Sequence, residues 1–343
     1  MKHLLNTLYI TTQGSYLACE GQTVHVRANR ETKLKIPILS LGAIVCFGRV
    51  GVSPPLMGLC GLHKVTLSFF NLYGRFLARV HGPVSGNVLL RREQYRCADK
   101  ESSCEMMARA VVSAKVANGR NVLLRSARDR PNDPNADSLT RAAGVMVRLL
   151  EELRCPCTLE ALRGIEGEAA KTYFGVFDHL ITTQKEGFFF QQRTRRPPMD
   201  NVNAILSFLY SLLANDLASA LEGVGLDPAV GFLHRDRPGR MGLALDLMEE
   251  FRPILADRLV LSLINRQQIT ARGFRKTETG AVMMNDETRK EVLVAYQKRK
   301  QEEIRHPFLG ETVAVGLLPH VQAMLLARHL RGDLDGYPPF FWK

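Results

Sequence analysis

The feature that most limits the fold is a change in hydrophobic pattern at Gly82-Pro83-Val84-Ser85-Gly86. Before this segment, compact apolar runs such as Ile44–Phe47 and Val65–Phe70 are separated by turn residues, a pattern that predicts β-strands. After it, apolar residues recur at helical spacing. Strands followed by helices favour an α+β protein of two domains. We therefore expect a small N-terminal β domain at residues 1–85 and a large all-helical C-terminal domain at residues 86–343.

Individual helices are predicted from start signals and apolar spacing. The sequence Ser53-Pro54-Pro55 combines a capping residue with prolines and predicts a short helix inside the β domain. Residues 203–221 are apolar around most of the helical circumference, which predicts a central buried helix. Further helices are expected over residues 243–266 and 313–330.

Charge indicates the class of partner. Lys and Arg total 46 against 34 Asp and Glu, so the net charge is +12. Residues 1–90 hold nine basic and two acidic residues (+7), and the remainder holds 37 and 32 (+5). A basic chain favours a polyanion such as nucleic acid, and the division of charge predicts that the polyanion touches both halves.

Cysteines and hydropathy indicate the compartment. The seven cysteines are an odd number scattered over a long chain, which favours a reducing cytoplasm over a disulfide framework. The N-terminus is a poor signal peptide, and we expect no membrane-spanning segment. The predicted localisation is cytoplasmic.

Three segments carry side chains suited to catalysis. Glu166 lies between two glycines in Arg163–Lys171, where a ligand can approach closely, although a Glu that merely begins a helix is the alternative. His234 follows an apolar triplet and precedes a basic loop. Asp246, Glu249 and Glu250 have helical spacing that gathers three carboxylates on one face, with a solvated acidic face as the alternative.

Together these segments supply the ligands that Mg²⁺ or Mn²⁺ prefers, namely carboxylates and an imidazole. Basic residues lie near them in the sequence. Carboxylates with a metal, surrounded by arginines, suit phosphodiester chemistry. The candidate DNA-binding residues are Arg193, Arg195, Arg196, Arg235, Arg237 and Arg240.

Three motifs resemble one family over essentially the whole chain. They are GIEGEAAKTYF at 164–174, RTRRPPMDNVNAILSFLYSLL at 193–213, and GFLHRDRPGRMGLALDLMEEFRPILADRLVLSLINR at 231–266. The sequence is similar to the CRISPR-associated endonuclease/integrase of spacer acquisition, the larger of the two near-universal CRISPR adaptation proteins. The ending at residues 336–343, GYPPFFWK, resembles subtype I-C.

The resemblance implies roles for individual residues. The Glu of the family's first motif falls on Glu166, the His of the third on His234, and the acidic pair of the following helix on Asp246 and Glu249. These four are the predicted catalytic residues. Glu166, His234 and Glu249 are the predicted ligands of one Mg²⁺ or Mn²⁺, and Asp246 is an additional ligand or a supporting group. Some relatives carry Asp where this chain has Glu249, whose longer side chain keeps a carboxylate within reach.

The resemblance also implies an activity and partners. The 3′-hydroxyl of a short double-stranded DNA fragment would attack a phosphodiester at the end of a CRISPR repeat, inserting the fragment as a new spacer. The family forms a homodimer that works with a dimer of the small second CRISPR adaptation protein. Two alternatives stay open from the residues alone: a free-standing metal-dependent nuclease acting on branched DNA in repair, and a non-catalytic DNA-binding scaffold.

Overall fold

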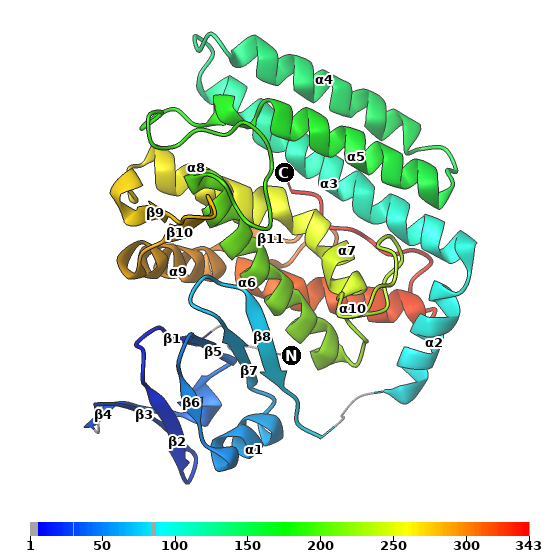
Figure 1. The fold of residues 1–343 in the computed structure, drawn as a ribbon. Coiled ribbons are helices and arrows are strands. Elements are labelled where there is room, and N and C mark those ends of the chain that lie inside the picture. The colour runs from blue at the N-terminus through cyan, green and yellow to red at the C-terminus, as the bar shows by residue number, and fades with distance from the viewer. Residues whose placement is uncertain (1–5, 30, 84–86, 343) are drawn as a thin grey trace.

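The computed structural model describes residues 6–29, 31–83 and 87–342. In this part of the chain the strands of residues 7–80 lie together and the helices form the larger body, as Figure 1 shows. The predicted order of strands before helices is therefore confirmed. The predicted boundary between residues 85 and 86 falls outside the described residues.

The N-terminal part contains two four-stranded sheets. The first has the order β1-β5-β7-β8, with β8 antiparallel to three parallel strands: β1 (Thr7–Ile10), β5 (Ala43–Phe47), β7 (Thr66–Phe70) and β8 (Phe76–Val80). The second has the order β4-β3-β2-β6: β4 (Glu31–Pro37), β3 (Thr23–Ala28), β2 (Tyr16–Glu20) and β6 (Gly51–Val52). Helix α1 (Pro54–Leu62) begins where predicted, because the Ser53 hydroxyl accepts a hydrogen bond from the Leu56 amide.

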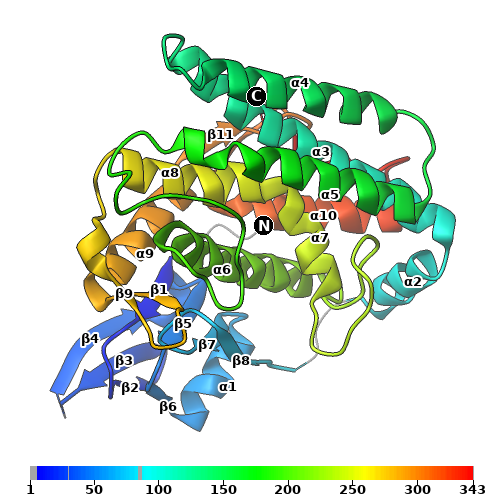
Figure 2. The ribbon, with the colours of Figure 1, turned by 45° about the horizontal axis from the view of Figure 1, so that its top comes forward.

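Helices dominate the rest of the chain. They are α2 (Val88–Ala98), α3 (Glu101–Asp129), α4 (Ala136–Glu152), α5 (Leu159–Gly175), α6 (Asn201–Val224), α7 (Gly242–Phe251), α8 (Arg258–Asn265), α9 (Asp286–Gln301) and α10 (Leu318–Leu330). Figure 2 shows α3, α4 and α5 side by side as one layer above the central helix α6. The long helix α3 contacts both α5 and α7, which brings residues far apart in sequence together.

Helix α6 is the predicted central helix. Its length and apolar composition would suit a membrane span, but 67% of its most apolar window is buried inside the protein. Two short hairpins interrupt the helices, so the expectation of an all-helical C-terminal part is wrong in this detail. Their strands are β9 (Phe274–Lys276), β10 (Val282–Met284), β11 (Glu303–Arg305) and β12 (Thr312–Ala314).

The segment predicted as one helix over residues 243–266 contains a π-helical turn at Arg252–Asp257 between α7 and α8. Pro253 has no backbone N–H to donate, which removes one α-helical hydrogen bond at this point. Residues 253–257 are all buried, so this segment has no exposed face, and the spacing of apolar residues cannot reveal the change of helix type.

The β part has a hydrophobic core of its own, and one face of its first sheet joins the core of the helices. The Phe47 ring packs 5.7 Å from the Phe208 ring of α6, and both are fully buried. The Arg79 guanidinium on β8 donates to the Asn215 side chain at 2.8 Å and pairs with Glu222 at 2.7 Å. These polar contacts are largely desolvated, so they fix the orientation of the sheet on α6.

Candidate active site

Glu166 and Glu249 come from separate helices that both pack on α3. Glu166 lies in the middle of α5, whose start is capped by the Thr158 hydroxyl accepting from the Ala161 amide. The alternative in which Glu166 serves only to begin a helix is therefore excluded. Glu249 lies near the end of α7. Lys115 on α3 lies between the two carboxylates and forms an ion pair with each.

The Glu249 carboxylate is held between two cations. Its Oε1 atom lies 2.7 Å from an Arg252 nitrogen and its Oε2 atom 2.7 Å from the Lys115 ammonium, and only 2% of the side chain is exposed. Burial alone would raise the pKa of Glu249. The charges of Arg252 and Lys115 outweigh burial and lower this pKa to about 2, so the group is ionised at neutral pH.

His234 is fixed by Asp246. The His234 ring nitrogen Nδ1 lies 2.6 Å from Asp246 Oδ1. The same carboxylate accepts the backbone N–H groups of Phe232, Leu233 and His234 at 2.6 to 3.0 Å. Both oxygens of Asp246 therefore bind the loop that carries His234. Because the imidazole contacts Asp246 through Nδ1, its Nε2 atom is the one that can bind another partner.

The acidic helix differs from the expected solvated face. Asp246, Glu249 and Glu250 are all buried, and they point to three different partners. The Glu250 carboxylate accepts hydrogen bonds from the Tyr337 hydroxyl at 2.7 Å and the Phe340 amide at 2.8 Å. Glu250 thus holds the C-terminal segment, and the three carboxylates do not form one cluster.

No three His, Cys, Asp or Glu side chains lie close enough to form a finished metal site within residues 6–29, 31–83 and 87–342. The three predicted ligands nevertheless fit a divalent cation by their chemistry. Glu249 Oε2 is buried, makes no hydrogen bond and faces a positive charge, and Glu166 faces the same charge. A carboxylate pair with a free imidazole nitrogen is a donor set for Mg²⁺ or Mn²⁺.

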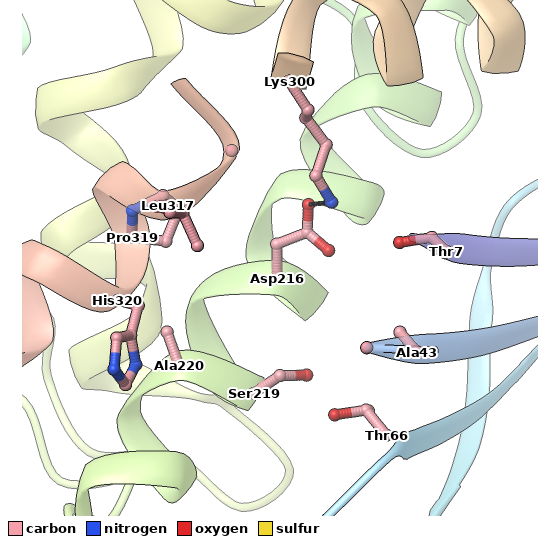
Figure 3. Close-up of a pocket in the computed structure, with 12 residues that line it drawn as sticks. Thr7, Ala43, Thr66, Asp216, Ser219, Ala220, Lys300, Leu317, Pro319 and His320 are labelled. Atoms are coloured by element: carbon pink, nitrogen blue, oxygen red, sulfur yellow. Dashed lines mark hydrogen bonds and ion pairs between the residues drawn. The ribbon is translucent and has the colours of Figure 1, made fainter. Parts of the chain in front are cut away.

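A cavity in the described part of the chain lies away from these residues. It has a volume of about 60 Å³ and lies between α6 and the ends of strands β1, β5 and β7. Figure 3 shows Asp216 and Ser219 facing Thr7, Ala43 and Thr66 across it. The Lys300 ammonium is 2.9 Å from the Asp216 carboxylate. None of the predicted site residues lines this cavity, so the candidate active site is defined by its carboxylates and not by this cavity.

Comparison with known proteins identifies the family. The family model "CRISPR associated protein Cas1" matches residues 8–298. The chain is 54% identical over 343 residues to "CRISPR-associated endonuclease Cas1 1" of Chlorobaculum tepidum, and the alignment covers all of both chains. The chain belongs to the Cas1 family. The resemblance found in the sequence motifs is therefore confirmed at the level of the family.

Two solved structures share the fold. "Casposase bound to integration product" matches with a TM-score of 0.84 at 21% identity, covering 98% of this chain and 94% of that one. The "Cas6-RT-Cas1--Cas2 complex" also matches with a TM-score of 0.84, at 22% identity, covering 100% of this chain and 36% of that one. At these identities the likeness shows the Cas1 fold alone.

The predicted DNA-binding arginines of this Cas1 family member divide into two groups. Four are exposed on two loops: Arg195, Arg196, Arg235 and Arg237. Burial together with the charge of Arg237 lowers the pKa of Arg240, which is only partly exposed. Arg193 is different, because it donates to the Asn203 and Ser207 side chains and stacks on the Tyr210 ring. Its contacts are structural.

Two charged residues of the site were missed in the sequence. Arg252 follows Glu249 by three positions, so helical spacing alone could have paired them. Lys115 is 51 positions before Glu166, and no local pattern links them. The available signal was its position between Ala114 and Val116, which are both buried, because a lysine among core residues requires an acidic partner.

Proposed function

We propose that this protein is a metal-dependent DNA endonuclease and integrase that inserts short foreign DNA fragments as new spacers into a CRISPR array. The observation that carries the proposal is the pair Glu166 and Glu249, which share the Lys115 ammonium as their ion-pair partner. The relative from Chlorobaculum tepidum is named an endonuclease, and the casposase with this fold was solved with an integration product. Both names support phosphodiester chemistry as the activity.

Glu166, Glu249 and His234 Nε2 would hold one Mg²⁺ or Mn²⁺. Bound there, the ion would supply Lewis-acid catalysis, polarising the phosphodiester and favouring deprotonation of the attacking hydroxyl. The low pKa of Glu249 keeps this ligand in the charged form that a cation requires. Asp246 fixes the tautomer and the direction of the imidazole, as second carboxylates do in many carboxylate–histidine metal sites.

The remaining residues act on the DNA. The exposed residues Arg195, Arg196, Arg235 and Arg237 would bind phosphates of the fragment and of the repeat. Arg252 already neutralises one Glu249 oxygen and so limits the negative charge that the approaching DNA meets. No protein nucleophile is needed, because the 3′-hydroxyl of the fragment attacks.

We infer the partners from the family. The protein would act as a homodimer in the cytoplasm together with a dimer of the small second CRISPR adaptation protein. A complex that names both Cas1 and Cas2 contains a chain with this fold, which supports that partnership. The subtype I-C assignment, which rests on residues 336–343, stays a prediction.

The test is half-site integration of a 3′-hydroxyl DNA duplex into a supercoiled plasmid that carries the repeat, with the small partner and Mn²⁺. The wild-type protein should join the strands, and Glu166→Gln or Glu249→Gln should lower the rate by at least about 100-fold. Glu168→Gln is the matched control, because Glu168 lies on the same helix and pairs with Arg148 at the surface.

Absence of strand transfer by the folded wild-type protein would overturn the integrase assignment. Cleavage of branched DNA without the partner, combined with no integration in its presence, would favour the free-standing repair nuclease. Full integration by the Glu166→Gln variant would show that the carboxylate site is not catalytic and would leave the scaffold alternative.

A further inference from the structure

The space between the two acidic helices already holds a cation that belongs to the chain. The Lys115 ammonium forms ion pairs with Glu166 and with Glu249, and 13% of its side chain is exposed. It is the one side chain that bridges the two predicted carboxylate ligands among the described residues. A position between two carboxylates is also where a metal cation would bind.

An ordinary structural ion pair does not account for this arrangement. Glu249 has a complete partner in Arg252, which lies 2.7 Å from Oε1. Lys115 is a second cation for the same carboxylate, and it lies 2.7 Å from Oε2 without the direction of a hydrogen bond. Lys115 also donates a hydrogen bond to Glu166, so the two carboxylates together hold its ammonium, and a cation of higher charge can compete for them.

We propose that Lys115 is a resident counter-ion, which occupies the metal position in the metal-free protein and is displaced when a divalent cation binds. This inference rests on the proposed metal-dependent function. Lys115 is accordingly a positioning residue that sets metal affinity. Its charge offsets the repulsion between the carboxylates of α5 and α7 and so holds them around one position.

Lysine suits this role by its chemistry. Its charge sits at the end of a flexible stem, so the ammonium can leave without moving α3. Removing the partner of a buried charge destabilises a protein, so the metal-free state depends on Lys115 for stability. A divalent cation provides twice the charge and can take over both carboxylates, but it must first break two ion pairs. The resident ammonium therefore lowers the affinity for the metal.

The test compares Mn²⁺ binding by titration calorimetry and thermal unfolding with and without Mn²⁺, using the full-length protein. Lys115→Met should melt at a lower temperature than wild type without Mn²⁺ and should bind Mn²⁺ about tenfold more tightly. Saturating Mn²⁺ should remove most of the difference in melting temperature. Lys115→Arg should bind Mn²⁺ more weakly than wild type, because a guanidinium can bridge two carboxylates more firmly.

Lys171→Met is the matched control. Lys171 is exposed on α5, the helix of Glu166, so this variant removes the same charge near the site without removing an ion pair. Its Mn²⁺ affinity should stay within about twofold of wild type, since exposed charges are screened.

Two results would overturn the inference. One is an unchanged or weaker Mn²⁺ affinity in Lys115→Met together with equal destabilisation in both conditions, which a purely structural lysine predicts. The other is unchanged Mn²⁺ affinity in Lys115→Arg, and this result decides the question if Lys115→Met does not fold. Failure of the wild-type protein to bind Mn²⁺ would instead overturn the proposed metal site itself.

Discussion

Asp246 shows how one buried side chain controls the candidate site. Its two oxygens accept three backbone N–H groups and contact the His234 ring. The Asn side chain in Asp246→Asn has only one acceptor oxygen, so some of these N–H groups lose their hydrogen-bond acceptor. We expect the free energy of unfolding to fall by about 2–3 kcal/mol, measured by urea unfolding. Mn²⁺ binding, measured by calorimetry, should weaken by about tenfold or more.

Asp236→Asn is the control for this prediction, because Asp236 is exposed on the same loop. It should change neither quantity appreciably. If Asp246→Asn kept full stability and full Mn²⁺ affinity, the carboxylate would not be what orients His234.

A second residue-scale prediction concerns pH. Burial raises the pKa of Asp257 to about 6, against the opposing hydrogen bond that the Tyr210 hydroxyl donates at 2.6 Å. The folded protein thus holds this proton more tightly than the unfolded chain does, so Asp257 lowers stability as pH rises from about 4 to about 6. Tyr210→Phe removes the hydrogen bond and moves this pKa further upward. Its cost should be small at pH 5 and grow to about 1–2 kcal/mol at pH 8.

Urea unfolding of Tyr210→Phe at the two pH values measures this difference. The Tyr210 ring keeps its place between Arg193 and Arg252 in the variant, so packing is preserved. Tyr95→Phe is the control, because its hydroxyl donates to Asp227 on an exposed surface. A cost for Tyr210→Phe that is equal at both pH values would contradict the assigned role of Asp257.

The sequence revealed part of the site at the residue scale. Glu166 and His234 were predicted because their local neighbours, glycines and a basic loop, are unusual. Asp246 was identified, but its contact with His234 was not, because the two residues are 12 positions apart. The contact depends on the path of the loop between them, which the spacing of apolar residues does not predict. Lys115 was missed altogether, because its partners come from two helices that only the packing of α3 brings together.

At the scale of elements, the C-terminal segment is anchored by α3. The fully buried Asn118 side chain donates to the carbonyl groups of Glu250 and Phe340 at 2.8 Å, and accepts the Trp342 amide at 2.7 Å. The Arg258 guanidinium stacks 4.2 Å from the centre of the Trp342 ring. Phe340 and Trp342 are therefore part of the core around α7.

Asn118→Ala should release this segment. The substitution leaves three buried backbone groups without partners, which we expect to cost about 2–4 kcal/mol. Hydrogen exchange should accelerate at the amides of residues 340 and 342, while α4 stays protected. Ser113→Ala, on the same helix, should leave the exchange unchanged. Unaltered protection of the segment in Asn118→Ala would show that packing of the aromatic rings suffices to hold it.

Helices were predicted best where a local sequence signal is sufficient to define them. The apolar circumference of 203–221 identified α6, and the Ser53 cap identified the start of α1. The helix expected from Val313 begins only at Leu318, because Thr312–Ala314 pairs with Glu303–Arg305 in a hairpin. Such a hairpin depends on a partner strand several residues away, and the apolar spacing of residues 313–330 does not report it.

At the scale of the whole molecule, positive charge is spread over both parts, while the acidic site is buried within the helical part. The net charge of +12 therefore predicts affinity for DNA, but it gives no indication of the carboxylates in the candidate site. Arg195 and Arg237, exposed on two loops, should contact phosphates directly. Each such contact releases counterions from DNA, so it adds to the salt dependence of binding.

The double variant Arg195→Gln, Arg237→Gln should therefore bind duplex DNA more weakly and with a shallower salt dependence. Fluorescence anisotropy between about 50 and about 300 mM salt should show the slope of log K against log salt falling by about 2. The double variant Lys290→Gln, Lys298→Gln removes the same charge from exposed positions on α9 and should leave the slope near that of wild type. Equal losses in both variants would mean that net charge, and not these loops, determines where the DNA lies.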